Sequence, residues 1–224
     1  MIGVAHQRKI RDSRSVSERP PIGVVLPVAM EDASLCEVSY STAKEVILDY
    51  EYLGTMPSGF RCAYGIYWSG ACAGVVVFGS PNPMQIAKSL FGGPWQDAVM
   101  QIHRGACVWW AHPHSASRLI GFALRELGKQ KRWRAVVAFS DPDAGEIGTV
   151  YQATNFLYCG LTAKRPDYFT ESGRRCVGHF NTAGLVKRDR VRKRRYVHLM
   201  RRFRKESMAS LKWPVRPYDK RASE

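Results

Sequence analysis

The chain has 224 residues, of which 45% are hydrophobic and 11% aromatic, and this composition excludes a wholly disordered protein. Its 34 lysines and arginines outnumber its 19 acidic residues, which gives a formal net charge of +15. Fifteen of the basic residues but only four acidic ones lie from Lys187 to Glu224, so +11 of that charge falls in the last 38 positions. A nearly neutral body followed by a strongly basic segment predicts a polyanionic partner.

The sequence also predicts where the protein works. No apolar run approaches the roughly 18 residues that a membrane-spanning helix needs, and the N-terminus lacks the apolar core of a secretory signal. Six cysteines are scattered without a CxxC pair, which favours reduced thiols over disulfides or a zinc site. We therefore expect a cytoplasmic protein with no membrane partner.

The first half of the chain shows few strong patterns. Residues 1–21 are polar and basic and end in a Pro-Pro pair, so we expect a flexible arm. Apolar residues at helical spacing predict a helix over 42–52 that ends before Gly54. Two apolar runs that flank Ser69-Gly70 predict a hairpin, and the Pro/Gly-rich stretch 79–94 predicts a long loop.

The central part is more regular. Residues 105–110 read as a buried strand, and the loop AHPHSAS leads from it into a helix over 117–128. The strand WRAVVAFS, a helix over 148–156 and the strand LYCGLT follow. This alternation predicts an α/β fold with a mixed, partly parallel central sheet flanked by helices. The segment YFTESGRRCVGHF reads as a hairpin that turns at residues 171–173.

A first candidate site is the loop before the 117–128 helix. The backbone N–H groups at a helix start attract phosphate or carboxylate groups, and Ser115, Ala116 and Ser117 are small enough to let an anion approach. A plainer interpretation is that Ser115 or Ser117 only caps the helix. The loop alone does not decide between the two.

A second candidate site is the end of the WRAVVAFS strand. Asp141 follows the strand, and Tyr151 lies on the next helix with Asn155 one turn further along the same face. A carboxylate and a phenol that converge at a strand end form a plausible acid–base pair. The alternative is that Asp141 starts an Asp-Pro turn and Tyr151 belongs to the core. Asp143 and Glu146 likewise fit a capping box.

Two further segments carry candidate residues. Tyr52 lies in an aromatic-rich stretch that either stacks a base or packs in the core, and Arg104 precedes a strand where it either faces solvent or holds an anion. The basic segment interleaves its charges with apolar residues, which indicates an element packed on the body with one cationic face. A nucleic acid is favoured over a membrane surface as its partner. The candidate nucleic-acid contacts are Lys187, Arg188, Arg190, Arg192, Lys193, Arg194, Arg195, Arg201 and Arg202.

The strand, AHPHSAS loop, helix, strand and ATNFLYCGLT segment together resemble the core of the GNAT acyltransferase superfamily. More narrowly, the stretches EYLGTMPSG, GVVVFGSPN, HPHSASRLIG, SDPDAGEIGTVYQATNFLYCGLT and KRRYVHL resemble the Mom proteins of bacteriophages. Mom proteins convert adenine in phage DNA to an N6-carbamoylmethyl derivative that blocks host restriction. The resemblance implies a GNAT-like catalytic domain over 22–184, a basic C-terminal DNA-binding extension over 185–224 and double-stranded DNA as partner. Removal of residues 187–205 should then leave the folded core intact.

The resemblance also implies site residues. The central acid and tyrosine of the family fall on Asp141 and Tyr151, and its loop–helix entry falls on Ser117 and Arg118. The donor's phosphates would lie on the loop at His114, Ser115, Ala116, Ser117 and Arg118, with Asn155 nearby. The donor would be acyl-CoA or another activated acyl or glycyl group, such as one borne by a tRNA.

Three positions depart from the family pattern. Glu51 precedes the family tyrosine, here Tyr52, where we expect histidine, and Glu146 follows Gly145 where we expect a Gly-His pair. Iron has been associated with the family, and the loss of two imidazoles weakens that expectation. Alternatively, the two glutamates could replace them, since carboxylates also bind iron; we assign no metal ligands. Phe156 replaces the general-acid tyrosine of many acetyltransferases, which leaves Tyr151 for that role. Arg104 matches the family arginine before the strand.

We therefore expect a transferase in which adenine N6, flipped out of the duplex, meets Asp141 and Tyr151. Asp141 would orient or deprotonate the amine, and Tyr151 would stabilise the leaving group. The alternatives are an N-acetyltransferase that acts on a protein or small-molecule amine, and a non-catalytic DNA-binding protein of the same fold.

Overall fold

The computed structural model describes residues 6–93, 95–173, 175–176 and 182–218. Its centre is a seven-stranded sheet in the order β1-β2-β3-β4-β5-β10-β6. All its neighbouring pairs are antiparallel apart from β4 and β5, so the expectation of a partly parallel sheet holds for that pair alone. The strands are β1 (Ser34–Val38), β2 (Phe60–Trp68), β3 (Ala71–Gly79), β4 (Val99–Cys107), β5 (Ala135–Ser140), β6 (Leu157–Leu161) and β10 (Arg194–Leu199).

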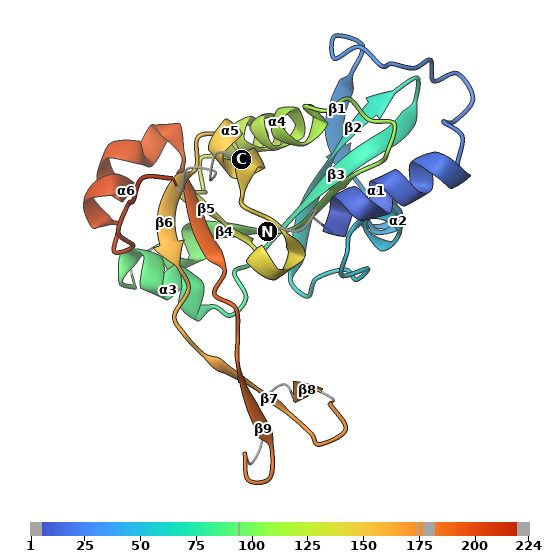
Figure 1. Ribbon diagram of the computed structural model, residues 1–224. Helices are drawn as coiled ribbons and strands as arrows, with labels where there is room; N and C mark the ends of the chain where they lie inside the picture. Colours follow the sequence, from blue (N-terminus) through green and yellow to red (C-terminus); the bar gives the residue numbers. More distant parts are fainter. Residues whose placement is uncertain (1–5, 94, 174, 177–181, 219–224) are drawn as a thin grey trace.

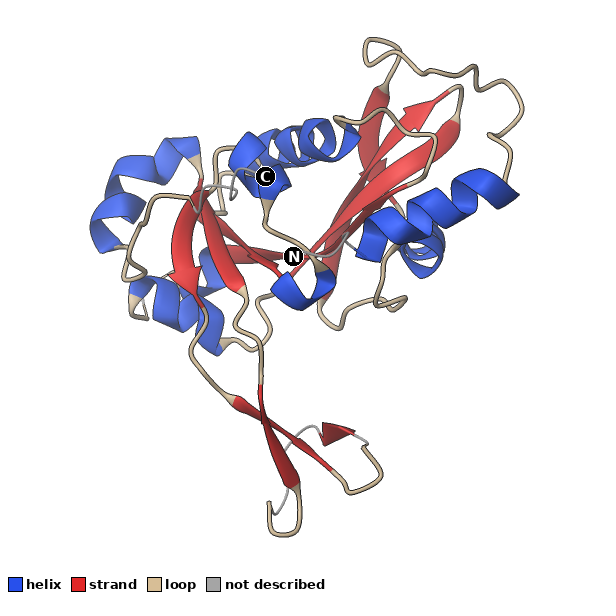
Figure 2. Ribbon diagram, in the orientation of Figure 1, coloured by secondary structure: helices blue, strands red, loops and turns tan. Residues whose placement is uncertain are grey.

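Helices flank both faces of this sheet (Figures 1 and 2). The helix α2 packs on β3 and β4 from one side, α4 packs on β2 and β3 from the other, and α1 lies beside α2 (Figure 1). The α-helices are α1 (His6–Ser17), α2 (Tyr40–Tyr50), α3 (Gln85–Phe91), α4 (Ser115–Lys129), α5 (Thr149–Ala153) and α6 (Arg204–Ser210). Short 3₁₀ turns are η1 (Gln96–Ala98), η2 (Pro142–Ala144) and η3 (Arg201–Phe203).

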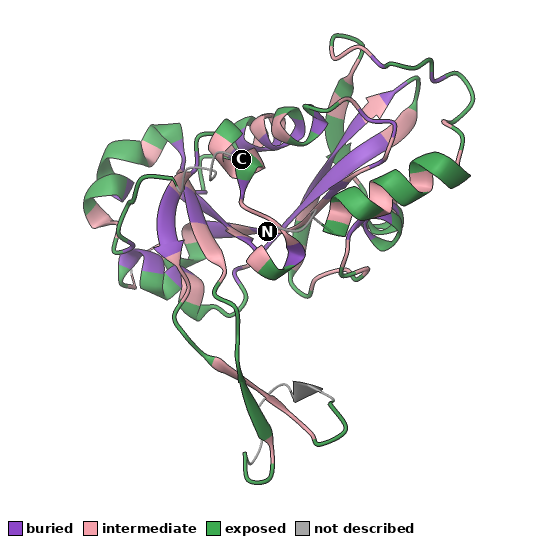
Figure 3. Ribbon diagram, viewed as in Figure 1, coloured by how far each residue is buried: buried purple, intermediate pink, exposed green. Residues whose placement is uncertain are grey.

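The core forms where the apolar patterns predicted it. One face of α4 buries Leu119, Ile120, Ala123, Leu124 and Leu127, and each buried leucine contributes about 1.5–3 kcal/mol to folding. The predicted helix over 117–128 and the predicted hairpin, here β2 and β3, are therefore confirmed. Strands β3 and β5 are buried along most of their length (Figure 3). Helices α2 and α4 cover the two faces of β3, and β5 lies inside the sheet between β4 and β10.

The sheet opens between β4 and β5. Their parallel pairing covers only residues 99–101 against 135–137. Beyond Gln101, β4 continues to Cys107 bonded to β3, while β5 continues to Ser140 bonded to β10. The two strands therefore end apart, and their free inner edges face the same space.

A second, three-stranded sheet projects from the body (Figure 1). It has the order β8-β7-β9, with β7 (Pro166–Phe169), β8 (Arg175–Cys176) and β9 (Val186–Asp189). All four residues of β9 are exposed (Figure 3). The predicted turn at 171–173 is present, since Gly173 N donates to Thr170 O, but the end of the predicted hairpin lies outside the described residues. We call residues 166–189 the arm.

The N-terminal segment differs from its prediction. Instead of a flexible arm over 1–21, residues 6–17 form α1, which buries none of its side chains. Polar contacts dock it: Gln7 Nε2 donates to Gly105 O (2.9 Å), and Tyr50 Oη donates to Glu18 (2.7 Å). A helix held by hydrogen bonds leaves no apolar period in the sequence, which is why the pattern gave no signal. Similarly, the expected loop over 79–94 contains α3, which buries Ala87, Leu90 and Phe91.

The expected boundary at residue 185 is also corrected. Strand β10 belongs to the central sheet, where it lies between β5 and β6 and pairs with both. Its Tyr196, Val197 and Leu199 are at most 1% exposed. The strand within the basic C-terminal segment is therefore part of the core rather than of an extension, because its apolar residues are buried between β5 and β6. Removal of residues 187–205 would take this strand out of the sheet, so we no longer expect it to leave the folded core intact.

Candidate active site

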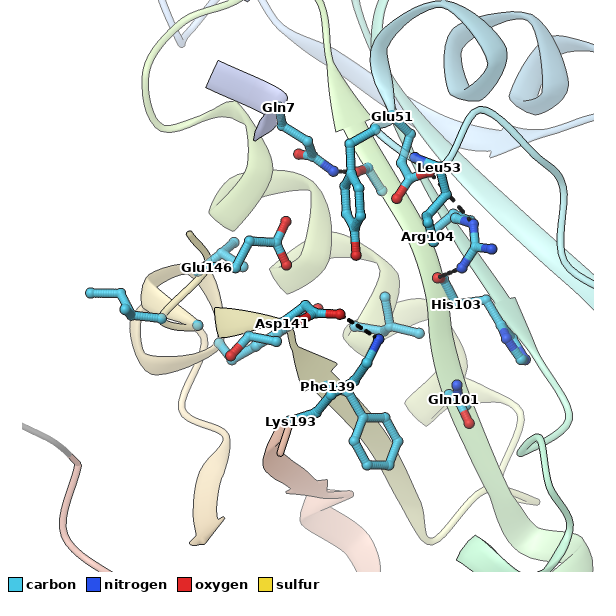
Figure 4. A pocket seen from close by; sticks show the side chains of 18 of the residues that line it. Gln7, Glu51, Leu53, Gln101, His103, Arg104, Phe139, Asp141, Glu146 and Lys193 are labelled. Atoms are coloured by element: carbon cyan, nitrogen blue, oxygen red, sulfur yellow. Dashed lines mark hydrogen bonds and ion pairs between the residues drawn. The ribbon is translucent and has the colours of Figure 1, made fainter. Parts of the chain in front are cut away.

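A cavity of about 1840 Å³ lies where β4 and β5 separate. Its walls come from both strands, from α1 and the start of α4, from the loop before α5 and from the segment that leads into β10. Seven polar side chains gather on it from elements far apart in sequence: Glu51, Tyr52, Arg104, Asp141, Glu146, Tyr151 and Lys193. Figure 4 shows Asp141, Glu146 and Lys193 on one side of the space and Glu51 and Arg104 on the other.

Asp141 stands at the end of β5 and forms an ion pair. Lys193 Nζ lies 2.8 Å from Asp141 Oδ2, and both side chains are largely shielded from solvent. The other oxygen, Oδ1, accepts from Asp143 N (3.1 Å), so Asp141 both starts the Asp-Pro turn and faces the cavity. Thr162 fixes the backbone of Lys193: its N donates to Lys193 O (2.8 Å), and its Oγ1 accepts from Lys193 N (3.0 Å). The pair is thus built on two strand ends rather than on flexible loops.

Glu146 is the most perturbed carboxyl group of the site. Burial raises its pKa to about 7, and the negative charges of Glu51 and Asp141 act in the same direction, whereas Lys193 opposes them. The loop holds Glu146 between Gly145 and Gly148, both with positive φ, and Tyr196 Oη donates to Ile147 O (2.8 Å). A side chain at Gly148 would collide with the Tyr196 ring, so this close packing requires glycine.

Glu51 and Tyr52 follow the end of α2. Glu51 is only 6% exposed; its Oε2 accepts from Leu53 N (2.9 Å) and lies 3.6 Å from Arg104 Nε. Burial raises the pKa of Glu51, and the Leu53 N–H and the Arg104 charge oppose that rise. Burial also raises the pKa of Tyr52 well above its usual range, with the charges of Glu146, Asp141 and Glu51 adding to it. Tyr52 therefore remains a protonated donor among carboxylates.

Tyr151 lies on α5 in a group of aromatic rings. Its ring centroid is 5.1 Å from that of Tyr196 and 5.4 Å from that of Phe156. Burial raises its pKa far above the usual range, and the nearby charge of Glu146 adds to this. The sequence left a choice between a core role and a site role, and Tyr151 fills both, because it packs on the core and lines the cavity.

The start of α4 is built differently from the prediction. Pro113 and Ala116 line the cavity, whereas the hydroxyls of Ser115 and Ser117 donate to the carbonyls of His112 (2.6 Å) and His114 (3.0 Å). In the described structure the N-cap, His114, makes no side-chain capping bond. The simple capping interpretation is therefore not supported. His112 accepts from the N–H groups of His114 (3.1 Å) and Ser115 (2.9 Å), which leaves those of Ala116 and Ser117 for other partners in this described turn.

Three other expected site residues are not among those that line the cavity. Ser117 bonds to its own turn as above, Arg118 is exposed on α4, and Asn155 is exposed after α5 with a positive φ of 59°. The structure thus does not bring Ser117 or Asn155 to the carboxylates. Sequence reasoning about the helix face of Tyr151 failed for Asn155 because α5 ends at Ala153.

The candidate nucleic-acid residues separate into two groups. Lys187, Arg188 and Arg190 are exposed on or next to β9, and Arg192, Arg201 and Arg202 are exposed near the ends of β10. Lys193 and Arg195 instead turn into the cavity wall and are half-buried, and Arg194 is half-buried in β10. The strand period accounts for the difference, because alternate residues face opposite sides.

Two functional features escaped the sequence analysis. Glu146 was read as a capping-box residue or a substituted family position, and its burial beside two other carboxylates needs the fold to be seen. Ser140 was not singled out, yet it is 1% exposed, lines the cavity and has an Oγ without a hydrogen-bond partner among the described residues. A buried hydroxyl of this kind is available to a ligand.

The described residues do not form a metal centre. Among them no group of three or more histidine, cysteine, aspartate or glutamate side chains has an arrangement that would hold a metal ion. The carboxylates of the cavity are engaged by Lys193, Arg104 and backbone N–H groups instead. These residues therefore do not fit the iron that the family resemblance suggests. In the same part of the chain, no helix is both long and apolar enough to cross a membrane.

Solved structures with a similar arrangement are acetyltransferases. The ribosomal-protein-S18-alanine N-acetyltransferase of Escherichia coli has 7% identity and a TM-score of 0.44, and covers 75% of this chain and 94% of its own. A GNAT family acetyltransferase from Elizabethkingia anophelis with acetyl-CoA bound has 12% identity, a TM-score of 0.45 and coverage of 75% and 99%. The spermidine/spermine N-acetyltransferase of Vibrio cholerae, in complex with manganese ions, has 9% identity, a TM-score of 0.46 and coverage of 79% and 98%.

The mixed sheet flanked by helices thus resembles that of GNAT acetyltransferases. No curated protein matches the chain at a significant level. A profile of the Mom protein family matches residues 32–176, which is well over half of the chain and includes the strands that part around the cavity. The chain belongs to the Mom protein family.

Proposed function

We propose that the protein is a DNA-modifying transferase that converts adenine to an N6-carbamoylmethyl derivative and so protects the DNA from restriction. The observation that carries the proposal is the meeting of Asp141, Glu146, Tyr52, Tyr151 and Lys193 in one cavity at the separated strand ends. Acid–base groups in such a cavity suit proton removal from an amine. Family membership supplies the substrate class, and the exposed basic side chains that line the cavity, Arg165, Arg190 and Lys212, fit a polyanionic substrate such as double-stranded DNA.

Glu146 is the group we assign as general base. With a pKa raised to about 7 by burial, it is both substantially ionised and basic enough to accept a proton at neutral pH. Asp141, fixed by Lys193, orients the amine through a hydrogen bond. The exocyclic amine loses one proton to Glu146 as N6 bonds to the methylene carbon of the transferred group and the bond from that carbon to the leaving group breaks.

The tyrosines serve as hydrogen-bond donors. Because burial and neighbouring carboxylates raise the pKa of Tyr52 and of Tyr151 far above neutrality, both phenols keep their protons. A protonated phenol stabilises negative charge that develops on the donor as its leaving group departs. Ser140 Oγ is the further buried group able to bond to the substrate.

The donor would be an activated acyl or glycyl group carried by coenzyme A or by a tRNA. Attack on the carbonyl of a glycyl group would give the isomeric N6-glycyl product, so the carbamoylmethyl product requires the donor to present its methylene carbon as the electrophile. The groups that would hold it are the backbone N–H groups at the start of α4, beside Pro113 and Ala116, and the inner edge of β4. Adenine must leave the duplex to reach Glu146, because its amine is otherwise enclosed in the base stack. Such a reaction on DNA takes place in the cytoplasm of the host cell.

The test is mass spectrometry of nucleosides from the DNA of cells that express the protein. Wild type should yield N6-carbamoylmethyl-deoxyadenosine. Glu146→Gln should reduce the yield by about 10²–10⁴-fold, because the base is lost while the side-chain shape is kept. Glu31→Gln, at an exposed position outside the arm and the cavity lining, is the matched control and should leave the yield unchanged. Unmodified DNA with wild type, or full modification with Glu146→Gln, would contradict the proposal.

A parallel incubation tests the alternatives. With labelled acetyl-CoA, duplex DNA and cell protein, label in protein but never in DNA would point to an ordinary N-acetyltransferase. Tight DNA binding with no modified nucleoside and no label would point to a non-catalytic binding protein.

A further inference from the structure

One lobe of the cavity lies beyond the carboxylates and combines aromatic rings with basic groups. It lies between α3, the end of β5, the start of β10 and the loop after α6. Phe139, Arg195 and Trp213 form its floor: Arg195 Cζ lies 4.7 Å from the Trp213 ring centroid, and the Phe139 and Trp213 centroids are 6.3 Å apart. We call this region the basic–aromatic lobe. None of the roles assigned above uses it.

The sheet register connects the lobe to Asp141. Phe139 and Arg195 are cross-strand partners on β5 and β10 and therefore share one face. Asp141 and Lys193 lie two residues further along their strands, so their ion pair continues the same row. Two residues of strand span about 6.8 Å. The floor of the lobe therefore begins one step along the strands from the proposed catalytic carboxylate.

Arg195 has binding capacity left over. Its Nη2 donates to Cys159 O (2.9 Å), but its Nε is buried and has no hydrogen-bond partner in the part of the chain that the structure describes. Burial lowers the pKa of this guanidinium, and the charges of Arg192 and Arg216 act in the same direction. A buried cation with an open donor is costly unless an anion or acceptor meets it.

The rim of the lobe is basic. Arg165, Arg190 and Lys212 line the same cavity and are exposed to solvent. They come from three segments, before β7, after β9 and after α6. No short stretch of the sequence therefore predicts that they lie on one cavity. A half-buried ring, a stacked guanidinium and a basic rim together match a displaced nucleic-acid strand, in which bases stack and phosphates seek cations.

We infer that the basic–aromatic lobe binds the DNA nucleotide next to the flipped adenine, with its base on Phe139 and its phosphate on Arg195 and the rim. This inference rests on the proposed function for the identity of the target base. The lobe contacts the strand only once it is locally unpaired, whereas the arm contacts paired and unpaired DNA alike. The lobe thus lowers the free energy of the flipped state relative to the intact duplex.

The experiment measures binding by fluorescence anisotropy of the full-length protein. Two labelled DNA probes have one sequence: a perfect duplex, and a duplex with a central three-base mismatch bubble around an adenine. For Phe139→Leu we expect about tenfold weaker binding to the bubble, because one stacked base is lost, and unchanged binding to the duplex. Phe139→Leu keeps an apolar side chain of similar size, and circular dichroism checks its fold.

The double variant Arg190→Gln/Lys212→Gln keeps the proposal testable if the ring variant unfolds, because both side chains are exposed. It should reduce the dependence of log affinity on log salt for the bubble by about 1.4, the value for two phosphate contacts to a single strand. Arg201→Gln/Arg202→Gln, an exposed pair outside the cavity lining, is the matched control and should reduce bubble and duplex binding equally.

Equal loss on both probes with the lobe variants, or no loss on either, would overturn the inference. Tighter binding of an RNA oligonucleotide of the same sequence, with RNA binding lost in Phe139→Leu, would assign the lobe to a tRNA-borne donor instead and also overturn it. These readouts do not involve modified nucleosides. A selective loss of bubble binding without adenine modification in cells would therefore leave the lobe in place and reject the proposed function alone.

Discussion

The basic residues of one continuous segment occupy two unlike environments. Lys187 and Arg188 are exposed on the arm, where Arg188 lies over the Phe169 ring. Lys193 and Arg195, only a few residues later, turn into the cavity and contact Asp141, Cys159 O and Trp213. The same residue types therefore serve two purposes. Exposed charges suit a long-range contact with DNA, and half-buried charges position a carboxylate and a substrate strand.

The largest expected effect is the loss of folding when the part of the segment that contains β10 is deleted. Deletion of residues 187–205 removes β10 and exposes the inner edges of β5 and β6, so we expect no cooperatively folded protein. Replacement of 167–188 by Asn-Gly should instead preserve the fold, because Pro166 and Asp189 are cross-strand partners that a two-residue turn can join. Thermal unfolding followed by circular dichroism measures both. A cooperative transition in the first variant would show that β10 is not part of the core.

The second prediction concerns the pH dependence of the modification rate, which distinguishes the buried carboxyl group of Glu146 from the exposed charges of the arm. Glu146 must be ionised to act as base, so the modification rate should fall about tenfold per pH unit below its pKa of about 7. The groups that face it are Glu51, Asp141 and Lys193. Rates measured in vitro with wild-type protein between pH 5 and 8 test this, and a profile that stays flat through pH 7 would exclude Glu146 as the base.

The same group links pH to stability. Because the folded state raises the pKa of Glu146, its contribution to stability is full below its ordinary value of 4.5 and is lost as pH rises through about 7. Glu146→Gln should therefore raise the melting temperature relative to wild type above pH 7, by about 2–4 °C for each kcal/mol, and not below pH 4.5. An equal shift at both pH values would assign the effect to packing rather than to charge.

Periodic, apolar features were predictable from the sequence. The amphipathic α4, the β2–β3 hairpin and the buried β5 each follow from the spacing of apolar residues. Helix α1 was missed because its contacts are mainly polar, with Ile10 as a partly buried apolar contact to the core that makes no helical pattern alone. The place of β10 between β5 and β6 is a long-range pairing that no local pattern records.

The site was predictable in part for the same reason. Asp141 and Tyr151 stand at a strand end and on the following helix, and both line the cavity. Lys193 was assigned to DNA contact, since a lysine in a basic run gives no sign of the carboxylate that it meets. The raised pKa of Glu146 depends on burial and on Glu51, nearly a hundred residues away in sequence, so it emerges only with the fold.

One experiment tests the division of roles between arm and cavity most directly. It compares Lys193→Met with Lys187→Met, expressed in cells at matched levels. For each variant we would measure the modified fraction of deoxyadenosine in cellular DNA and the affinity of the protein for duplex DNA. Lys193→Met should lose modification by at least about tenfold while it binds duplex DNA as wild type does, because its lysine positions Asp141. Lys187→Met should weaken duplex binding, with a salt dependence reduced by about 0.9, and modify DNA that it has bound. Normal modification in Lys193→Met, together with weakened duplex binding, would contradict the account.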